Sequence, residues 1–437
     1  MTLENLFRVF DNYGCQKVFV KSLSPNDNSK NQVYLAGSFD LLNVFPIKEI
    51  ISDSSGDWER DRFKASLNFS WITDEGNLSP APKSQLILYP KYPEIRFSGF
   101  LQKSENPPSD LMTVRLAGRL LFMSVTNRGE ILGYVAHPDS SLATDFNGIN
   151  GLQAYGVFKV YELKSEKGAR ENLLSELYRI HKIGWIDSKR LDKDGSILSC
   201  LAPNCGGYTL EAELGITPNG FSEPDYLGWE LKQFGVSDFL RTQSAIITLM
   251  TPEPTGGFYK EQGVVEFLRK YGYPDKNGKE DRINFGGIHK VGLVHPLTNL
   301  NMELIGFDHG IGKIRNTDGR IALLDKTGLE VASWSFASLL KHWNRKHNLA
   351  CYIPSMSQTQ PNRQYQFGNS IILGTGTDFT LLLKEMAVGN IYYDPGIKLE
   401  NATKGVPKAK RRSQFRIKSG NLGSLYKVNE QIDLLKL

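Results

Sequence analysis

Short apolar runs dominate the first 160 residues of this chain. Each run is rich in β-branched and aromatic residues, and turn-forming residues separate one run from the next, which is typical of strands. The runs are KVFVKSL, QVYLAGSF, SQLILYP, RFSGFL, TVRLAGRLLFMSV, ILGYVAH and GVFKVYEL. SPNDNSK and KSENPPSD predict loops between them. Strands at this close spacing predict an all-β domain, either a barrel or a sandwich.

The pattern changes near residue 161. The segment ELKSEKGARENLLSELYRIHKIG is charged, and four of its apolar residues follow the spacing of one helical face. These residues are Leu173, Leu174, Leu177 and Ile180. The amphipathic helix that they predict indicates a domain boundary at 161–170. Beyond it, helix and strand patterns mix, which favours an α/β or α+β domain around a mixed sheet.

Further elements of the second domain follow from the same periodicities. Helices are predicted for TLEAELGI, VVEFLRKYGY and SFASLLKHWNRKH, a strand for AIITLMT, and a hairpin for NMELIGFD with RIALLDK. EPDYLGWELKQFG, residues 223–235, predicts a turn and then a strand. GTGTDF, residues 374–379, lacks the Lys-Ser/Thr of a phosphate loop and predicts a turn. Trp334 and Phe336 are interpreted as core residues.

Length and composition narrow the class of protein. A chain of 437 residues is long enough for two or three domains, and its 40% hydrophobic and 23% charged residues are ordinary for a soluble globular protein. The N-terminal MTLENLFRVFDNYG has no signal-peptide pattern, and no run of about 20 apolar residues predicts a membrane span. We therefore expect a cytoplasmic protein with no membrane partner.

The four cysteines, Cys15, Cys200, Cys205 and Cys351, are sparse, which indicates a reducing compartment. Cys200 and Cys205 could form half of a zinc site, but no second close pair completes it. The seven histidines show no metal-ligand spacing, so His289 and His309 are interpreted as satisfied core or surface residues.

Positive charge is concentrated near the C-terminal end of the chain. The net charge of +5 is modest, but residues 396–420 carry five lysines and three arginines against one glutamate, a local balance of +7. Two interpretations are open for this segment. It is either a solvated charged loop or a loop that contacts the phosphates and bases of a nucleic acid.

The stretch EPDYLGWELKQFG contains two carboxylates and a lysine at informative spacing. Glu230 and Lys232 lie two apart, so on a strand their side chains point to the same face. A turn near Gly228 would bring the carboxylate of Asp225 beside that of Glu230. Two carboxylates suit Mg²⁺, and Lys232 could orient or deprotonate a water beside it. Taken alone, an acidic-x-Lys pattern is more often a solvated strand face.

The helix predicted upstream offers a further acid for the same centre. Glu211 and Glu213 are both candidates, and the alternative for each is a solvent-facing carboxylate. Spacing alone favours Glu213, because it lies two positions from Glu211 and on a different helical face.

Five motifs in a fixed order carry a family resemblance. GGYTLEAELGI, PDYLGWELKQF, AIITLMTPEPTG, SWSFASLLKHW and SQFRIK resemble the MvaI/BcnI-type restriction endonucleases, which are similar to mismatch-repair nicking enzymes of the MutH kind. The resemblance covers roughly residues 170–437. It implies a PD-(D/E)xK nuclease fold and Mg²⁺-dependent hydrolysis of phosphodiesters. It also implies Asp225 and Glu230 as metal ligands, Lys232 as the catalytic lysine, and Glu211 rather than Glu213 as the auxiliary acid.

The same resemblance assigns base reading to the late basic loop. The residues that match are Lys410, Arg411, Arg412 and Arg416. MvaI-type enzymes are richer in histidine just before this loop, so the individual base contacts are open. Arginine suits guanine, because its fork pairs with O6 and N7 in the major groove. Phosphate contact alone is the alternative for Arg411 and Arg412.

The N-terminal half carries a different resemblance. KVFVKSLSPNDNSKNQ and YPKYPEIRFSGF resemble the N-terminal effector domain of EcoRII-type restriction enzymes, a DNA-binding pseudobarrel with two arms. The first arm would carry Lys21, Ser24, Asn26, Asp27, Asn28, Lys30 and Gln32. The second would carry Lys91, Glu94 and Arg96. By composition alone, SPNDNSKNQ is an ordinary hairpin loop.

Together the two resemblances imply a two-domain type II restriction endonuclease. Residues 1–163 would bind one copy of a CCWGG-type site as an effector, where W is A or T, and residues 170–437 would bind and cut another. The enzyme would be a monomer in the cytoplasm of a prokaryote, accompanied by a cognate DNA methyltransferase. The rival interpretations are a nicking enzyme of the MutH kind and a non-catalytic DNA-binding regulator.

Overall fold

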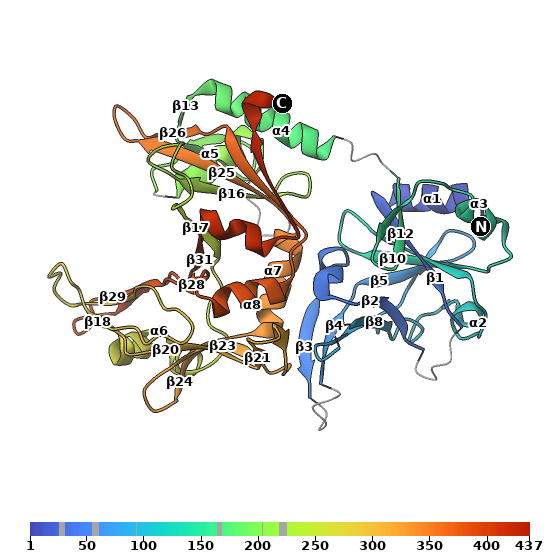
Figure 1. Cartoon of the computed structure of the whole chain (residues 1–437), viewed down its shortest axis with the longest axis horizontal. Helices are drawn as coiled ribbons and strands as arrows, with labels where there is room; N and C mark the ends of the chain where they lie inside the picture. The colour runs from blue at the N-terminus through green and yellow to red at the C-terminus, as the bar shows by residue number, and fades with distance from the viewer. Residues whose placement is uncertain (26–30, 55–60, 93, 164–167, 203, 218–224) are drawn as a thin grey trace. The chain divides into compact units, whose positions relative to one another are not determined.

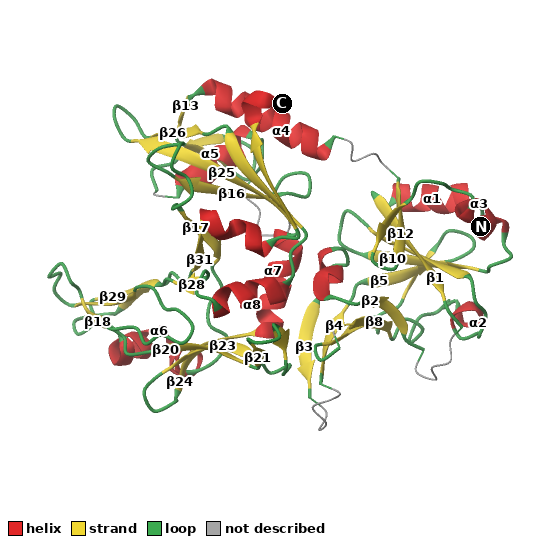
Figure 2. Cartoon of the chain, viewed as in Figure 1, coloured by secondary structure: helices red, strands yellow, loops and turns green. Residues whose placement is uncertain are grey.

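The computed structural model describes residues 1–25, 31–54, 61–92, 94–163, 168–202, 204–217 and 225–437 (Figure 1). Contacts divide the chain into two compact units, residues 1–170 and 171–437. Strands dominate the first unit, whereas helices and strands mix in the second (Figure 2). Within the described ranges, no helix has both the length and the apolar character needed to cross a membrane.

Two sheets form the N-terminal unit. The larger has the order β11-β12-β1-β9-β10-β5-β6 and the smaller β2-β8-β7-β4-β3. The larger sheet contains β1 (Lys17–Leu23), β5 (Phe69–Ile72), β6 (Leu78–Pro80), β9 (Arg119–Val125), β10 (Ile131–Ala136), β11 (Gln153–Tyr155) and β12 (Phe158–Glu162). The smaller contains β2 (Val33–Ala36), β3 (Glu49–Asp53), β4 (Arg62–Ser66), β7 (Gln85–Tyr89) and β8 (Glu94–Ser98). Each of the seven predicted apolar runs supplies a strand.

Helices also belong to this unit, although the strand pattern did not predict them. They are α1 (Leu3–Asn12), α2 (Ser109–Met112), α3 (Ser141–Asn147) and the 3-10 helix η1 (Phe39–Asn43). In α1, Leu6 and Phe10 lie four apart on one face and are fully buried. They join Phe146 of α3 and Val18 of β1 in one hydrophobic core, so tertiary packing stabilises the short helices.

A six-stranded mixed sheet is the centre of the C-terminal unit. Its path is β13-β26-β25-β27-β32, and β16 pairs with β25 as a further neighbour. The strands are β13 (Trp185–Asp187), β16 (Glu230–Gly235), β25 (Leu349–Gln358), β26 (Gln364–Phe367), β27 (Ser370–Thr375) and β32 (Val428–Asp433). β16 runs parallel to β25, and the other pairs are antiparallel.

The described part of the C-terminal unit has five α-helices, and three of them match the helices predicted beyond the first amphipathic one. They are α4 (Ala169–Ile183), α5 (Cys205–Glu213), α6 (Phe258–Tyr271), α7 (Phe336–His347) and α8 (Phe379–Ala387). In α4, the four residues of the predicted apolar stripe are all buried. GTGTDF is more than the predicted turn, because it ends β27 and begins α8, where Asp378 caps the helix.

Smaller sheets complete the C-terminal unit. β14 (Lys189–Leu191) pairs with β15 (Ile197–Ser199), and β21 (Phe307–Asp308) pairs with β22 (Lys313–Ile314). A three-stranded sheet contains β17 (Ile246–Met250), β31 (Phe415–Lys418) and β28 (Tyr392–Tyr393). A four-stranded sheet contains β18 (Tyr273–Pro274), β19 (Arg282–Gly286), β29 (Gly396–Glu400) and β30 (Lys408–Lys410). A second three-stranded sheet contains β20 (Asn301–Ile305), β23 (Arg320–Leu324) and β24 (Glu330–Ser335). The predicted pairing of NMELIGFD with RIALLDK is confirmed as β20 with β23. The 3-10 helices η3 (Ser419–Leu425) and η4 (Leu434–Lys436) flank β32.

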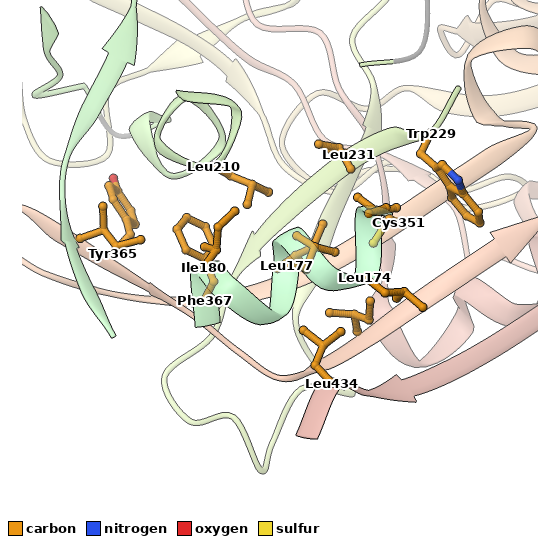
Figure 3. Packing of buried hydrophobic residues seen from close by; sticks show 14 of the residues in the cluster. Leu174, Leu177, Ile180, Leu210, Trp229, Leu231, Cys351, Tyr365, Phe367 and Leu434 are labelled. Atoms are coloured by element: carbon orange, nitrogen blue, oxygen red, sulfur yellow. The ribbon is translucent and has the colours of Figure 1, made fainter. Parts of the chain in front are cut away.

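One hydrophobic core joins the central sheet to α4 and α5. Leu177 of α4, Leu210 of α5, Leu231 of β16 and Cys351 of β25 are buried together (Figure 3). Burial of side chains of this size stabilises the fold by about 1.5–3 kcal/mol each. This packing fixes α5 and β16 against one another, which positions the acids that the two elements carry. Trp334 and Phe336 are also fully buried, as predicted.

The cysteines depart from the expectation of reduced thiols. Cys200 and Cys205 form a disulfide that closes the short connection before α5. The geometry places their Cα atoms 5.8 Å apart, which suits a bridge and leaves neither sulfur as a metal-binding thiolate. Cys15 and Cys351 are free and buried.

Candidate active site

β16 holds Glu230 and Lys232 at the edge of the core. Leu231 and Phe234 are buried, and Glu230 itself is only 1% exposed. Parallel pairing with β25 sets Glu230 beside Ala350 and Lys232 beside Tyr352. Because a strand alternates its faces, Glu230 and Lys232 project to one side, and their Oε1 and Nζ atoms lie 2.6 Å apart.

A tight turn brings Asp225 to the start of this strand. Tyr226 and Trp229 exchange backbone hydrogen bonds of 3.0 and 2.8 Å, and the two residues between them have positive φ. This is the backbone of a type I′ turn, which is easy for Gly228 but unusual for Leu227 with φ 47°. Asp225 Oδ2 then accepts a 3.0 Å hydrogen bond from the Leu231 N–H. The turn predicted near Gly228 is present.

Glu230 is the most constrained acid of the centre. Its Oε1 faces the ammonium of Lys232 at 2.6 Å and that of Lys346 at 3.4 Å. Its Oε2 is buried and has no hydrogen-bond partner among the described residues. Burial raises the pKa of Glu230, and Asp225 raises it further against the opposing charge of Lys232.

Glu211 of α5 is electrostatically coupled to the same two acids. Burial raises the pKa of Glu211 to about 7, and the charges of Asp225 and Glu230 add to the rise. Glu213 lies elsewhere, because its carboxylate pairs with Lys189 at 2.5 Å and Arg179 at 3.5 Å. The prediction of Glu213 from spacing is therefore wrong, since its carboxylate is held by Lys189 and Arg179, whereas that of Glu211 is coupled to Asp225 and Glu230.

The residues of the centre fit a divalent cation. Asp225 and Glu230 supply the hard oxygen ligands that Mg²⁺ prefers. The buried Oε2 of Glu230 lacks a partner, and such an atom is costly unless a ligand satisfies it. No group of three or more His, Cys, Asp or Glu in the described parts of the chain is arranged to hold a metal ion by itself. A cation here would have two carboxylates, with water and substrate oxygens as further ligands.

Sequence reasoning missed two residues of α7 that reach the centre. Lys346 contacts Glu230, and His347 is buried against Trp343 with ring centroids 4.2 Å apart. Burial lowers the pKa of His347 well below its usual value, and the charges of Lys232 and Lys346 contribute, so this imidazole is neutral. No local spacing links α7 to β16. The link arises from the pairing of β16 with β25, the strand that follows α7.

The late basic segment contains the strands β29, β30 and β31, and Arg411 and Arg412 lie in the loop between β30 and β31. β29 and β30 form a hairpin in which Lys398 and Lys410 are directly opposite each other. Two like charges at such a position are destabilising and suit a site that receives an anion. Lys410, Arg411 and Arg412 are exposed. We use the name basic hairpin for this hairpin together with the following strand β31 of a neighbouring sheet, residues 396–418.

Arg416 differs from its exposed neighbours in the basic hairpin. It lies on β31, where its guanidinium pairs with Asp394 at 2.5 Å and donates to Thr248 Oγ1 at 3.3 Å. A base contact by Arg416 would have to share or replace these bonds.

Candidate effector residues of the N-terminal unit divide into three groups. On β8, the Arg96 guanidinium forms an ion pair with the Glu94 carboxylate at 2.7 Å and donates a 3.4 Å hydrogen bond to Gln32 Oε1. Lys21 and Lys91 lie over the rings of Tyr34 and Tyr92, and the carbonyl of Ser24 accepts a bond from Arg119. Asn26, Asp27, Asn28 and Lys30 lie outside the described residues.

A polar hollow of about 480 Å³ opens on the smaller sheet beside Gln32. Its other polar lining includes Arg62, Lys64, Gln85 and Gln102, which sequence reasoning did not single out. On β4, Arg62 and Lys64 alternate with the buried Phe63 and Ala65, a pattern that shows a solvent-facing side but not a ligand.

Comparison with known proteins bears on the C-terminal unit. The model of the MvaI/BcnI restriction endonuclease family matches residues 174–426, more than half of the chain. The solved complex of restriction endonuclease MvaI with its cognate DNA substrate matches at 19% identity, over 61% of this chain and 99% of that chain, with a TM-score of 0.45. MvaI in the absence of DNA matches at 19% identity, over 62% and 99%, with a TM-score of 0.34. No curated protein matches the sequence. The chain therefore belongs to the MvaI/BcnI restriction endonuclease family and is a type II site-specific deoxyribonuclease.

Proposed function

We propose that this enzyme cuts double-stranded DNA at a CCWGG-type site by Mg²⁺-dependent hydrolysis. The observation that carries the proposal is Glu230, a buried carboxylate with two lysines on one oxygen and no partner among the described residues on the other. Asp225 lies beside it, and Glu211 is coupled to both. The target sequence rests on the resemblance of the motifs alone.

Each residue has a chemical role in this proposal. Asp225 and Glu230 would hold Mg²⁺, which supplies an acidified water and stabilises charge on the phosphate. Lys232 orients the attacking water and neutralises negative charge as it develops. The water gives up a proton as its oxygen attacks phosphorus in line, the bond to the 3′ oxygen breaks, and the 3′ oxygen takes up a proton from solvent. The products are a 5′-phosphate and a 3′-hydroxyl.

DNA binding in the proposal uses both units. The basic hairpin would contact phosphates and bases near the cut, through Lys410, Arg411, Arg412 and Arg416. The N-terminal unit, as an EcoRII-like pseudobarrel, would bind a second copy of the site. Its DNA-facing residues are Lys21, Ser24, Asn26, Asp27, Asn28, Lys30, Gln32, Lys91, Glu94 and Arg96. Paired cations such as Arg96 can exchange a carboxylate for a phosphate at little cost.

We further propose a monomer that cuts the two strands in turn, in a prokaryotic cytoplasm that also contains the cognate methyltransferase. The cleavage rate per enzyme should then be independent of enzyme concentration. A total cleavage rate that rises with the square of the enzyme concentration would show that two copies act together.

Cleavage of supercoiled plasmid tests the chemistry. With Mg²⁺ and a CCAGG or CCTGG site, we expect open circle followed by linear DNA, with ends that map inside the site. A reaction that stops at open circle indicates a nicking enzyme of the MutH kind. Asp225→Asn and Lys232→Met should abolish cutting but retain binding in Ca²⁺. Binding without cutting by the unaltered enzyme would leave a non-catalytic regulator.

A second experiment tests the effector site. A short duplex that carries the site, added in trans, should change the cleavage rate of a one-site plasmid, and a scrambled duplex should not. No difference between the two duplexes would remove the second-site proposal and leave the catalytic one intact.

A further inference from the structure

Lys346 enters the centre from an element remote in sequence. It lies in the last turn of α7, which ends at His347, and β25 begins at Leu349. Because Ala350 of β25 pairs with Glu230 of β16, the end of α7 is fixed beside the first residue of the catalytic strand. The stacking of His347 on Trp343, both about fully buried, anchors this end of the helix.

Both lysines meet the same oxygen of Glu230. Lys232 lies at 2.6 Å from Oε1 and Lys346 at 3.4 Å. The side chain of Lys346 is 33% exposed, whereas Glu230 is 1% exposed. This is therefore not an exposed surface pair of negligible value, because one partner is a buried charge.

The arrangement resolves a conflict in the role of Lys232. The proposed reaction needs its ammonium at the attacking water, but the structure holds it against Glu230. When Lys232 leaves, Oε1 of the buried carboxylate loses its nearest cation, and a buried charge that loses its partner is strongly destabilised. A second lysine already at 3.4 Å can take over Oε1 as the first one leaves.

We propose that Lys346 is a positioning residue that holds Glu230 Oε1 while Lys232 turns to the attacking water. The inference rests on the proposed function of Asp225, Glu230 and Lys232. Because Lys346 acts through Glu230, it keeps the other oxygen, Oε2, directed toward the cation site throughout the reaction.

Substitution of Lys346 separates this role from others. Lys346→Met should lower the single-turnover cleavage rate by about 10²-fold, in the range for loss of one preorganised charge. DNA affinity in Ca²⁺ and the salt dependence of binding should be unchanged. Lys346→Arg keeps a cation and a donor near Oε1 and should recover most of the rate. Lys341→Met, at an exposed position of α7, is the matched control and should cleave normally.

Several results would overturn the inference. A Lys346→Met enzyme with weakened DNA binding and a smaller salt slope would identify a direct phosphate contact. A folded Lys346→Arg enzyme as slow as Lys346→Met would show that a cation at this position is insufficient. Should Lys346→Met lower the unfolding temperature, Lys346→Gln measured below that temperature must show the same rate loss, or the role is structural.

Lys232→Met distinguishes failure of this inference from failure of the proposed function. If Lys232→Met is inactive and Lys346→Met cleaves normally, the centre stands and the inference falls. If Lys232→Met also cleaves normally, the proposed centre itself is wrong.

Discussion

The two units treat their charged side chains in opposite ways. On the smaller sheet of the N-terminal unit, the charged side chains form partly exposed ion pairs. Arg96 pairs with Glu94 at 2.7 Å, and Arg62 and Lys64 both lie 2.8 Å from Asp53. In the C-terminal unit, three coupled acids are accompanied by two lysines, and the acid that both lysines contact, Glu230, is only 1% exposed.

This difference fits a binding role for the smaller sheet and a chemical role for the acidic centre. Ion pairs on a partly exposed sheet can rearrange at little cost in free energy, so they suit reversible contact with phosphates. Crowded, buried carboxylates raise the free energy of the folded protein, and such groups occur mainly where a ligand relieves them. We therefore expect substitutions in the two regions to have different signatures.

Glu230→Gln should give the largest effect and the sharpest test of that difference. The cleavage rate should fall by about 10³-fold, since a preorganised charge is lost. The unfolding temperature, measured by calorimetry without metal, should stay the same or rise, because repulsion from Asp225 and Glu211 is relieved. Glu213→Gln is the control on an ion-paired acid and should cleave normally. A large loss of stability in Glu230→Gln would make Glu230 a structural residue.

Arg96→Ala should give the next largest effect, confined to binding. Loss of one proposed DNA contact should weaken second-site binding by about 1–3 kcal/mol, measured as the concentration of duplex in trans that half-saturates its effect. The cleavage rate without that duplex should not change. Arg8→Ala, at an exposed position of α1, is the control. Equal effects of both variants would argue against a specific site at β8.

The pH dependence of the free energy of unfolding should show that ionisation of the buried Glu211 carboxyl is unfavourable. Its pKa is raised from 4.5 to about 7 in the folded protein. Between these values the unfolded chain has lost the proton and the folded protein has kept it, so stability falls as pH rises from 4.5 to about 7. Glu211→Gln should flatten this part of the curve, as measured by urea unfolding of the metal-free protein. Addition of Mg²⁺ should shift the fall to lower pH if a cation binds beside the acids.

The smallest expected effect concerns the basic hairpin. Lys410→Ala removes one of two facing lysines, so the hairpin should be slightly more stable. If Lys410 contacts a phosphate, the slope of log affinity against log salt should decrease by about 1. An unchanged slope would favour a solvated hairpin.

The local sequence pattern predicted β16 and the turn before it, but not the segments that pack beside them. Alternation predicted β16, and the glycine predicted the turn that carries Asp225. Helical spacing gave the wrong acid on α5, because spacing cannot show that Glu213 meets Lys189 and Arg179. The family resemblance indicated Glu211, whose coupling to Asp225 and Glu230 the structure describes.

Long-range pairing explains what could not be predicted. Lys346 reaches Glu230 because β16 lies beside β25, and no periodicity within either segment specifies that register. The helices α1 and α3 were missed for a similar reason, since packing on the sheet stabilises segments too short to be stable alone.

The parallel pairing of β16 with β25 also has a consequence during synthesis. Glu230 and Ala350 are 120 residues apart, so β16 leaves the ribosome long before its partner strand β25. A nascent chain that ends before Leu349 has no strand against which Glu230 can be buried, and contacts of such separation form late in folding. The surroundings of Glu230 are therefore completed only late in synthesis.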